Sequence, residues 1–393
     1  MNGADTAWII VATALVLFMT LPGLALFYGG LVRARNVLSV LMQCFAIACL
    51  ISVLWLVLGY SIAFGEGNAV WGGFEKVMLT GITADTLSGT IPEVLLFAFQ
   101  MTFAIITPAL IVGAYVERIN FAFVLTFSGL WMLLVYAPVV HWIWGGGLLS
   151  GGEGALFREA VNDFAGGIVV HETAGLAALV IAVMLGARKD KLKPPHNPGF
   201  VMIGASMLWV GWIGFNGGSQ LAADGGAAMA LTVTHISAAT ASLSWALWER
   251  IKYGKSSMVG MVTGTIAGLA SITPASGSVG PAEALIIGAI AGILCQEACG
   301  LVKNLLKIDD TLDVFAVHGL GGMFGIVMLA ALGHASWAAQ LGGIVIVGVF
   351  TIVMTVIVAK TVSFIFPIRV EEEDEFNGLD ITSHGERAYD HSS

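Results

Sequence analysis

Residues 163–175 read DFAGGIVVHETAG, and residues 310–322 read DTLDVFAVHGLGG. Both stretches have an aspartate, seven further residues, a histidine, three residues and a glycine. The matched positions are Asp163 and Asp310, His171 and His318, and Gly175 and Gly322. Both histidines lie in apolar, glycine-rich stretches of sequence. An ionisable side chain is costly to keep inside a membrane, so a histidine in a membrane span indicates function. Two such histidines at matched places are a stronger signal than one.

The composition sets the class of protein. Of 393 residues, 57% are hydrophobic and 11% are charged, whereas an ordinary soluble domain has about 25% charged residues. The chain is therefore predicted to be an all-α polytopic protein of the lipid bilayer. Its 50 glycines indicate helices that approach one another closely, because small residues permit close packing in lipid.

Apolar runs long enough to cross a bilayer occur at eleven places. They cover roughly residues 7–30, 37–64, 92–115, 120–140, 164–187, 199–221, 226–248, 257–275, 282–303, 314–333 and 338–366. With the N-terminus outside, most lysines and arginines fall in inside loops, and only Lys76 and Arg158 fall outside. The inside set is Arg33, Arg35, Arg118, Arg188, Lys189, Lys191, Lys193, Arg250, Lys252, Lys255, Lys303, Lys307, Arg369 and Arg387. The positive-inside rule therefore predicts an outside N-terminus and an inside C-terminus.

An odd number of spans makes an inverted repeat of five plus five spans, with one extra helix, the expected architecture. The halves are about 1–190 and 199–335, and the extra helix, 338–366, is predicted to brace the bundle. Residues 1–366 form the transmembrane domain, and 367–393 form a cytoplasmic tail that holds most of the net charge of −9. Inverted repeats place the substrate path at their interface near the midplane. His171 and His318 are predicted to meet there.

Two imidazoles in an apolar path favour a small neutral base over a bare cation. Moving an ion into a dry medium costs tens of kcal/mol, whereas deprotonating an ammonium group of pKa about 10 costs about 4 kcal/mol at pH 7. Neutral histidines can donate to and accept from each other and a passing amine. Two alternatives are that each histidine only ties helices together, or that both bind a metal with Glu172. Glu172 points about 100° away from His171 on a helix, so no metal site and no cofactor are predicted.

The mouth of such a path is expected to hold aromatic rings, because ring faces attract ammonium ions. Trp144, in WGGG just after the fourth span, is a candidate, and the alternative is an interfacial anchor. Phe103 and Phe215 lie in the third and sixth spans, and each is interpreted either as a gate or as ordinary core.

These motifs together resemble the ammonium transporter (Amt/Mep/Rh) family, on the bacterial Amt side. The similar segments are PGLALFYGGLVRARNVLS (22–39), ITPALIVGAYVERI (106–119), WGGG (144–147), DFAGGIVVH (163–171), WIGFNGGS (212–219), ITPASG (272–277), DDTLDVFAVHG (309–319) and GLDITSHGERAY (378–389). They occur in order and cover nearly the whole chain. The resemblance implies an ammonium transporter of the inner (plasma) membrane, and not an enzyme.

The resemblance also implies roles for single residues. Trp144, Phe103 and Ser219 would form the outer ammonium-binding site, with Ser219 accepting a hydrogen bond from the ion, and Asp163 would support that site. Phe103 and Phe215 would form a stacked gate, and the two histidines would line the pore. The resemblance further implies homotrimers with one pore per subunit and a PII-type signal protein at the cytoplasmic face. It implies ammonium, ammonia or methylammonium as substrates, and no nucleic-acid partner.

Two departures from the family pattern concern the outer loop and one acid. The 145–163 stretch is longer than the common pattern, so a different outer vestibule is expected. Glu172 is not part of the core motif, and we expect it to have a hydrogen-bonding partner within the subunit or at the trimer interface. Two other functions compete with transport: an ammonium sensor with little flux, and a membrane-embedded hydrolase. The hydrolase lacks a nucleophile or a full ligand set near either histidine.

Overall fold

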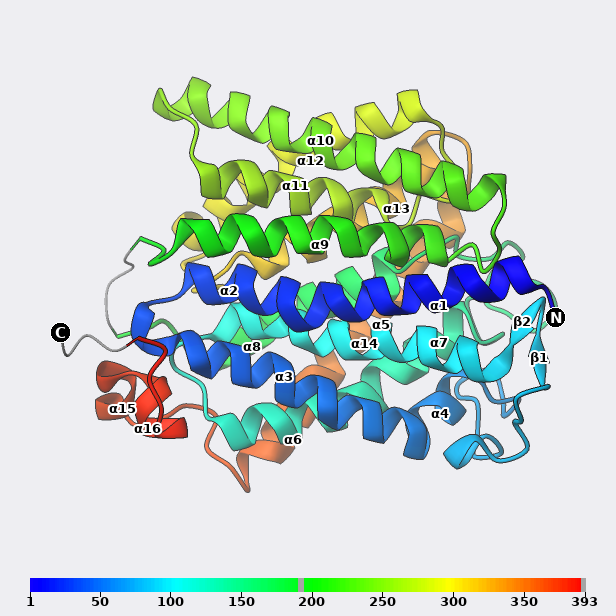
Figure 1. Ribbon diagram of the computed structural model, residues 1–393, viewed down its shortest axis with the longest axis horizontal. Helices are drawn as coiled ribbons and strands as arrows, with labels where there is room; N and C mark the ends of the chain where they lie inside the picture. The colour runs from blue at the N-terminus through cyan, green and yellow to red at the C-terminus, as the bar shows by residue number, and fades with distance from the viewer. Residues whose placement is uncertain (190–193, 390–393) are drawn as a thin grey trace.

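The computed structural model describes residues 1–189 and 194–389 as a bundle of roughly parallel and antiparallel helices (Figure 1). The helices are α1 (Gly3–Phe18), α2 (Ala25–Leu31), α3 (Val37–Leu54), α4 (Tyr60–Phe64), α5 (Glu93–Tyr115), α6 (Phe121–Trp131), α7 (Ala137–Ile143), α8 (Thr173–Leu185), α9 (Pro198–Gly218), α10 (Gly225–Tyr253), α11 (Met258–Ile272), α12 (Pro281–Gly300), α13 (Leu320–Ala331), α14 (Trp337–Ser363), α15 (Glu372–Asn377) and α16 (Leu379–His384). Strands β1 (Leu87–Ser88) and β2 (Ile91–Pro92) form one antiparallel pair.

Several long helices contain π-helical turns, which widen the helix locally. These turns are η1 (Met19–Leu24), η3 (Trp55–Gly59), η5 (Met132–Tyr136), η6 (Gly167–Glu172), η7 (Leu301–Leu305) and η8 (Phe315–Gly319), and the short 3₁₀ turns are η2 (Ala34–Asn36) and η4 (Val77–Leu79). Turns η6 and η8 carry His171 and His318 and open the helices that continue as α8 and α13. Both histidines therefore lie on irregular turns, which are common at functional sites.

The helices confirm a polytopic membrane protein. Within the described residues, nine helical stretches are long and apolar enough to cross a bilayer. Two shorter apolar helices, Met258–Ile272 and Phe315–Ala331, fall in the predicted ranges 257–275 and 314–333. The count of eleven spans stays a prediction. Lys191, Lys193 and the last four residues of the predicted tail lie outside the described residues.

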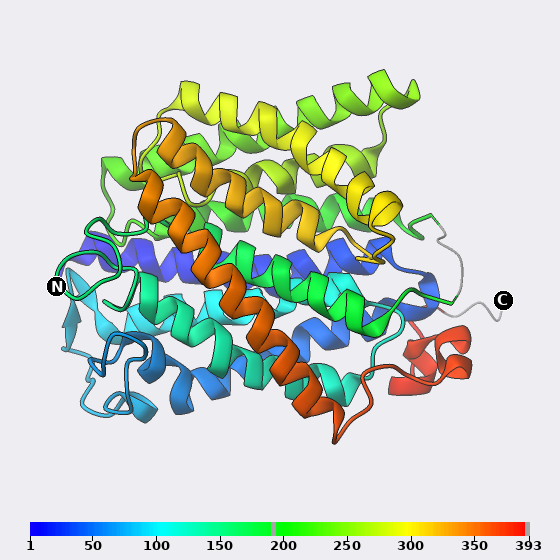
Figure 2. The same ribbon diagram turned by 180° about the vertical axis from the view of Figure 1, so that it is seen from behind.

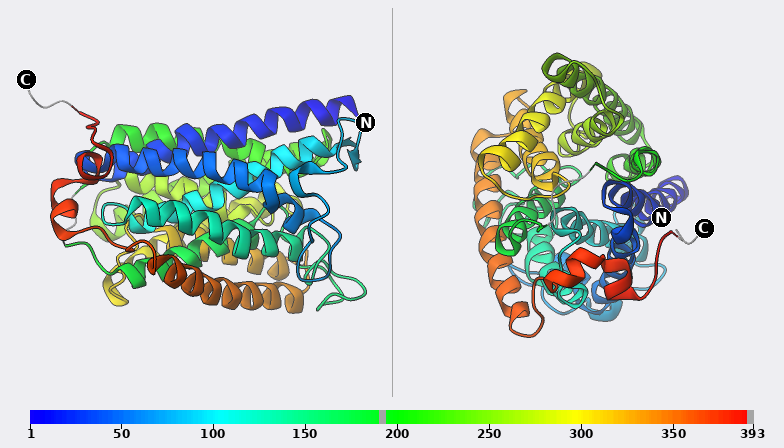
Figure 3. Two further views of the ribbon diagram at one scale, coloured as in Figure 1. Left: turned by 90° about the horizontal axis from the view of Figure 1, so that it is seen from below. Right: turned by 90° about the vertical axis from the view of Figure 1, so that its left-hand side faces the viewer.

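The two ends of the bundle differ. The end on the left in Figure 1 carries α15 and α16, and we call it the tail face. The chain's N-terminus and the β1–β2 pair lie at the other end, which we call the loop face. The end-on view in Figure 3 shows α15 and α16 lying across the tail face.

The segments that carry the histidines cross at glycines. A Cβ added to Gly175 would collide with the backbone of Gly319, and a Cβ on Gly322 would lie 2.8 Å from Cβ of His171. Gly175 and Gly322 are the glycines four residues after the two histidines. The spacing seen in the sequence thus lets two helices touch backbone to backbone beside the imidazoles.

We expect Gly175→Ala to lower the melting temperature of the detergent-solubilised protein. Alanine normally stabilises a helix relative to glycine by about 1 kcal/mol. At position 175 the collision with Gly319 reverses the sign of this effect on stability. The control is Gly225→Ala, at the start of α10, where nothing lies within 4 Å of the added atom. Equal melting temperatures for the two variants would contradict close contact at Gly175.

Helix α14 crosses the back of the bundle obliquely (Figure 2) and packs against α6, α8 and α13. Its exposed side is apolar, with Val345, Val349 and Val353 exposed. Its buried side includes Gln340, Thr351 and Thr355. A soluble helix exposes polar side chains and buries apolar ones. Helix α14 has the opposite pattern, as expected for a helix that faces lipid.

A cluster of charges ties the loops of the tail face together. Oε1 of Glu117 accepts from Nε of Arg33 at 2.9 Å and from Nδ2 of Asn36 at 3.2 Å, and its Oε2 accepts from Nη1 of Arg188 at 2.9 Å. Nε of Arg188 also donates to Oδ2 of Asp309 at 3.0 Å. The loops after α2, α5 and α8 and the loop before η8 are thereby joined.

The C-terminal helices are fastened to this cluster. Oε1 of Glu375 accepts from the backbone N–H of Lys189 at 2.8 Å, and its Oε2 accepts from Nη2 of Arg369 at 2.7 Å. Oδ1 of Asp380 accepts from the backbone N–H of Ser39 at 2.8 Å. The tail therefore packs on the loops at this end of the bundle.

We expect Glu117→Gln to lower the melting temperature at pH 7, and the difference from the wild type to vanish as the pH falls. Burial raises the pKa of Glu117, but the hydrogen bond and charge of Arg33 and the charge of Arg188 outweigh it and lower the pKa from 4.5 to about 2. Because its pKa is lower in the folded state, ionised Glu117 stabilises the fold above pH 4.5 by on the order of 3 kcal/mol. This stabilisation is lost as the pH falls through about 2.

The measurement is thermal unfolding in detergent from pH 7 to pH 2, with Glu153→Gln in an exposed loop as the control. A constant difference between the wild type and Glu117→Gln down to pH 2 would contradict an ionised, paired Glu117.

Candidate functional site

The first histidine segment begins at a carboxylate that binds four backbone amides. Oδ1 of Asp163 accepts from the N–H groups of Gly166 and Gly167 at 3.0 and 2.5 Å, and Oδ2 accepts from those of Ile168 and Val169 at 2.9 and 3.0 Å. Gly166 has φ 112°, a conformation that favours glycine. The amides at a helix start otherwise lack partners, so Asp163 allows this helix to begin inside the protein.

The second segment begins in the same way. Asp310 accepts from the N–H groups of Val314 and Phe315 at 3.1 and 2.8 Å and is fully buried. Asp313 adopts φ 61° just before the helix. The matched aspartates of the sequence pattern are thus both caps of the helices that carry the histidines.

The two histidines meet. Nδ1 of His171 and Nδ1 of His318 are 3.2 Å apart, and the ring centroids are 5.2 Å apart with 23° between the planes. Both side chains are buried, with exposed fractions of 1% and 4%. A contact between two ring nitrogens requires one to donate and the other to accept, so a pair of neutral rings satisfies it.

A series of aromatic rings connects Trp144, near the loop face, to the histidines. The centroids of Trp144 and Phe103 are 6.2 Å apart at 90°, and those of Phe103 and Phe215 are 4.2 Å apart at 33°. Phe215 in turn lies 6.0 Å from His171. Phe103 and Phe215 are buried, so the two rings close the space between Trp144 and the histidine pair.

Trp144 and Ser219 lie at the outer end of this series. Nε1 of Trp144 donates to the backbone oxygen of Asp163 at 2.7 Å, which fixes the indole beside the cap. The Ser219 hydroxyl donates to the backbone oxygen of Phe215 at 2.8 Å. Because its proton is engaged, the Ser219 oxygen keeps lone pairs that can accept from another donor.

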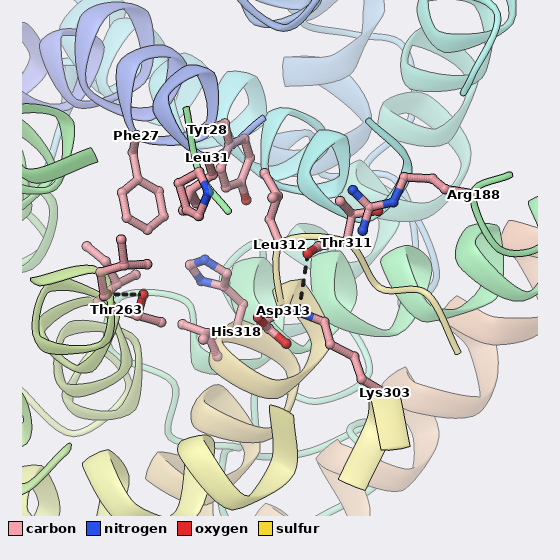
Figure 4. Close-up of a pocket in the computed structure, with 14 residues that line it drawn as sticks. Phe27, Tyr28, Leu31, Arg188, Thr263, Lys303, Thr311, Leu312, Asp313 and His318 are labelled. Atoms are coloured by element: carbon pink, nitrogen blue, oxygen red, sulfur yellow. Dashed lines mark hydrogen bonds and ion pairs between the residues drawn. The ribbon is translucent and has the colours of Figure 1, made fainter. Parts of the chain in front are cut away.

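At the inner end, His318 opens into a cavity of about 220 Å³ on the tail face (Figure 4). Phe27, Tyr28 and Thr263 line the cavity with the His318 ring. Further toward the tail face, Nζ of Lys303 binds Oδ2 of Asp313 at 2.6 Å. The site thus changes from apolar rings to charged groups below the second histidine.

The predicted residues therefore fall into one series. Trp144, Phe103, Phe215 and the two histidines follow one another by direct ring contacts, and Asp163 and Ser219 are joined to the series by hydrogen bonds. Trp212 was not predicted. Its ring lies 5.4 Å from that of His171 at 23°, and its Nε1 donates to Thr273 at 2.8 Å. Its position one turn before Phe215 on the same helix could have indicated it.

Glu172 was expected to have a hydrogen-bonding partner within the subunit or at the trimer interface. The described part of the subunit offers none, and a partner at the trimer interface stays a prediction. The exposed fraction of Glu172 is 0%, and neither carboxyl oxygen has a hydrogen-bond partner among the described residues. Its side chain lies against α14, with Oε1 3.0 Å from where a Cβ of Gly348 would be. The 145–163 loop also packs on α14, where a Cβ of Gly343 would lie 2.9 Å from Val161.

The chemistry of the series is that of an uncharged path. Its side chains from Trp144 to His318 carry no fixed charge, and its imidazoles can hydrogen-bond a small base. In residues 1–189 and 194–389, no group of three or more histidine, cysteine or acidic side chains is placed to hold a metal ion. The arrangement can therefore guide a small neutral molecule that donates and accepts hydrogen bonds.

Known proteins similar to this chain agree with one another. The Ammonium Transporter Family model matches residues 7–389. The chain is 43% identical over 412 residues to an ammonium transporter of Bacillus subtilis, with 100% of each chain covered. It is 42% identical over 409 residues to a putative ammonium transporter of Methanothermobacter thermautotrophicus, with 99% of each covered.

Solved structures give the same result. Candida albicans Mep2 matches with a TM-score of 0.86 at 33% identity, covering 95% of this chain and 88% of that one. A protein named Sensor Amt Protein matches with a TM-score of 0.88 at 26% identity, covering 97% of this chain and 98% of that one.

Proposed function

This chain belongs to the ammonium transporter family, and we propose that it recruits ammonium outside, deprotonates it and conducts ammonia through a twin-histidine pore. The carrying observation is the unbroken series of contacts from Trp144 through Phe103 and Phe215 to His171 and His318. An ion would lose its hydration along such a series without a fixed charge to replace it, so the neutral base is the form that passes.

The recruitment site we propose consists of Trp144, Phe103 and Ser219, with Asp163 behind it. The indole and phenyl faces attract the cation, and the free lone pairs of Ser219 accept one of its N–H groups. Asp163 contributes by fixing the indole and the start of the pore helix. Phe103 and Phe215 then act as the gate, and their rings must move apart to let each molecule pass.

The architecture that we propose has eleven spans, an outside N-terminus, and an inverted repeat of residues 1–190 and 199–335. The matched contacts of Gly175 and Gly322 support the repeat. Residues 1–366 then form the transmembrane domain, 338–366 the extra helix and 367–393 the tail. We extend the proposal to the homotrimer, the inner (plasma) membrane and the PII-type partner that family resemblance implies, with the tail face turned to the cytoplasm.

The second candidate function is an ammonium sensor with little flux. The observation that favours it is the high structural similarity to a protein named as a sensor. Binding at the outer site would then be read by the tail, which is fastened to the loops near the inner cavity.

Proteoliposomes with purified protein separate the two functions. A transporter is expected to change the internal pH after an ammonium pulse and to carry methylammonium inward after a methylammonium pulse. Both rates should rise with the protein-to-lipid ratio. Protein that binds ammonium, as measured by calorimetry, but gives flux no greater than empty liposomes would refute transport and support the sensor.

A further inference from the structure

The WGGG turn that carries Trp144 encloses an imidazole to which the proposed mechanism gives no role. His141 lies in the last turn of α7, three residues before Trp144, and is 3% exposed. A Cβ on Gly145 would lie 2.8 Å from Nδ1 of His141, and a Cβ on Gly147 would lie 2.9 Å from its Cδ2. Glycine at these two positions therefore leaves room for the His141 ring inside the turn.

Both ring nitrogens of His141 face backbone carbonyl groups. Nδ1 lies 3.1 Å from the oxygen of Ala63, and Nε2 lies 2.7 Å from the oxygen of Asn68. A carbonyl oxygen only accepts, so a hydrogen bond to each of them needs a proton on each ring nitrogen. A neutral imidazole has one N–H group, and its other nitrogen would point a lone pair at a carbonyl oxygen. The two contacts therefore fit an imidazolium ion.

The surroundings of the ring suit a cation. His141 lies at the end of the helical stretch Phe121–Ile143, and the C-terminal end of a helix stabilises positive charge. A buried charge also needs hydrogen bonds to replace its hydration, and the two carbonyl groups provide them. On α4, η5, η6 and the 65–76 segment, which surround α7, the titratable side chains of the described chain do not hydrogen-bond to the ring; they are Tyr60, Glu66, Glu75, Lys76, Tyr136, His171 and Glu172.

The ring joins the 63–70 segment, which ends α4 and begins the loop after it, to the turn that carries Trp144. A second hydrogen bond holds the same segment. Nε1 of Trp142, the residue next to His141, donates to the backbone oxygen of Val70 at 2.7 Å. The end of α7 is therefore bound to this segment by one titratable side chain and by one that is neutral at every pH.

His141 also closes the turn through its backbone. Its carbonyl oxygen accepts from the N–H groups of Gly145 and Gly147 at 3.1 and 2.9 Å. Trp144 lies inside the turn that these bonds close, and the centroid of its indole is 6.2 Å from that of Phe103. A His141 ring that lost a carbonyl partner would shift the backbone on which the indole is placed. The outer site thus depends on a ring whose two nitrogens are both bound to the protein and are not available to a substrate.

We propose that His141 is a positioning residue of the outer ammonium site and that it acts as an imidazolium, with its two N–H groups holding the 63–70 segment against the turn that carries Trp144. The inference rests on the proposed function, because Trp144 is part of the proposed recruitment site. The proton stays on the ring throughout the transport cycle. The charge strengthens both contacts, since hydrogen bonds from an ionised donor are about twice as strong as neutral ones.

The first test measures the protonation of His141 directly. Full-length protein with nitrogen-15 in its histidine rings is reconstituted in lipid bilayers, and NMR spectra of the wild type and His141→Gln are recorded at neutral pH. We expect the signals that His141→Gln removes to come from two protonated ring nitrogens. A signal from a bare ring nitrogen would overturn the proposal. If His141→Gln does not fold, the His141 signals are identified in the wild type by their proximity to the backbone of Gly145 and Gly147.

The second test measures methylammonium uptake into proteoliposomes and separates KM from kcat. We expect His141→Gln to raise KM by a factor on the order of 30, as for the loss of a hydrogen bond from a charged donor. Its kcat should stay within about twofold of the wild type, because the histidine pair is unchanged. A role confined to folding would instead lower the amount of active protein, and so kcat, without raising KM.

Two further variants serve as comparisons for His141→Gln. Trp142→Phe removes a neutral hydrogen bond to the same segment and should raise KM by about fivefold. His235→Gln, at an exposed position on α10, should match the wild type. A rise in KM that is clearly larger in His141→Gln than in Trp142→Phe therefore supports the charged contact.

The outcomes separate the two proposals. A wild type without methylammonium or ammonium flux overturns the proposed function, whatever the protonation of His141. In a wild type that transports, the role of His141 alone is overturned by an unchanged KM in His141→Gln, by a loss of kcat without a rise in KM, or by equal rises in KM in His141→Gln and Trp142→Phe. The NMR result needs only folded protein, so it does not depend on the rate of transport.

Discussion

The double variant His171→Ala, His318→Ala is expected to lose selective ammonium flux by a factor on the order of 100 or more, while still folding. The two rings are each other's hydrogen-bonding partners, with 3.2 Å between the Nδ1 atoms. Removing both rings leaves no ring nitrogen without its partner. Such a paired change costs less stability than removing one side of a buried pair. What is lost is the polar surface that a dehydrated base can bind between the gate and the inner cavity.

Uptake of methylammonium by cells, together with ammonium-pulse flux in liposomes, measures this effect. His235→Ala is the control, because His235 is exposed and its ring contacts Trp209 instead of the pore histidines. Each single variant is expected to fall between the wild type and the double variant. Undiminished and selective flux in the folded double variant would remove the basis of the proposed mechanism.

The histidine pair could be predicted because its signal is local. A fixed spacing from Asp163 to His171, repeated from Asp310 to His318, is visible in the sequence. The inference that the two would meet needed only the physics of membrane spans and of inverted repeats. The structure adds why the spacing exists: the aspartate caps the helix and the glycine lets the partner helix touch it.

Features that depend on the tertiary contacts were not visible. The position of Trp212 one turn before Phe215 could have marked it as a candidate, but only the fold shows that its ring stacks on that of His171, with 23° between the planes. The π-helical turns at both histidines were not predicted from the sequence either. The part of the expectation that placed a hydrogen-bonding partner for Glu172 within the subunit is not met among the described residues, because the rule that buried acids are paired describes most groups, and functional sites hold many of the exceptions.

We expect Asp163→Ala to abolish transport and to lower stability more than any other single change in the site. Four buried N–H groups donate to its carboxylate at 2.5–3.0 Å, and each buried donor left without a partner costs about 1–3 kcal/mol. The start of η6 would then open, and His171, eight residues further on, would lose its position opposite His318. Trp144, which donates to the backbone oxygen of residue 163, would shift as that backbone moves.

Asp163→Asn separates the structural contribution of the side chain from its charge. The amide oxygen can still accept two of the four N–H groups, but its NH₂ group meets the other donors, so we expect a folded protein with strongly reduced flux. Hydrogen exchange at Gly166, Gly167, Ile168 and Val169 measures the opening directly. Asp310→Ala is the matched comparison, because Asp310 accepts from only two backbone amides and should produce about half the loss of protection. Slow exchange at all four amides in Asp163→Ala, with flux lost, would show that Asp163 acts on ammonium through its charge instead of by holding the helix.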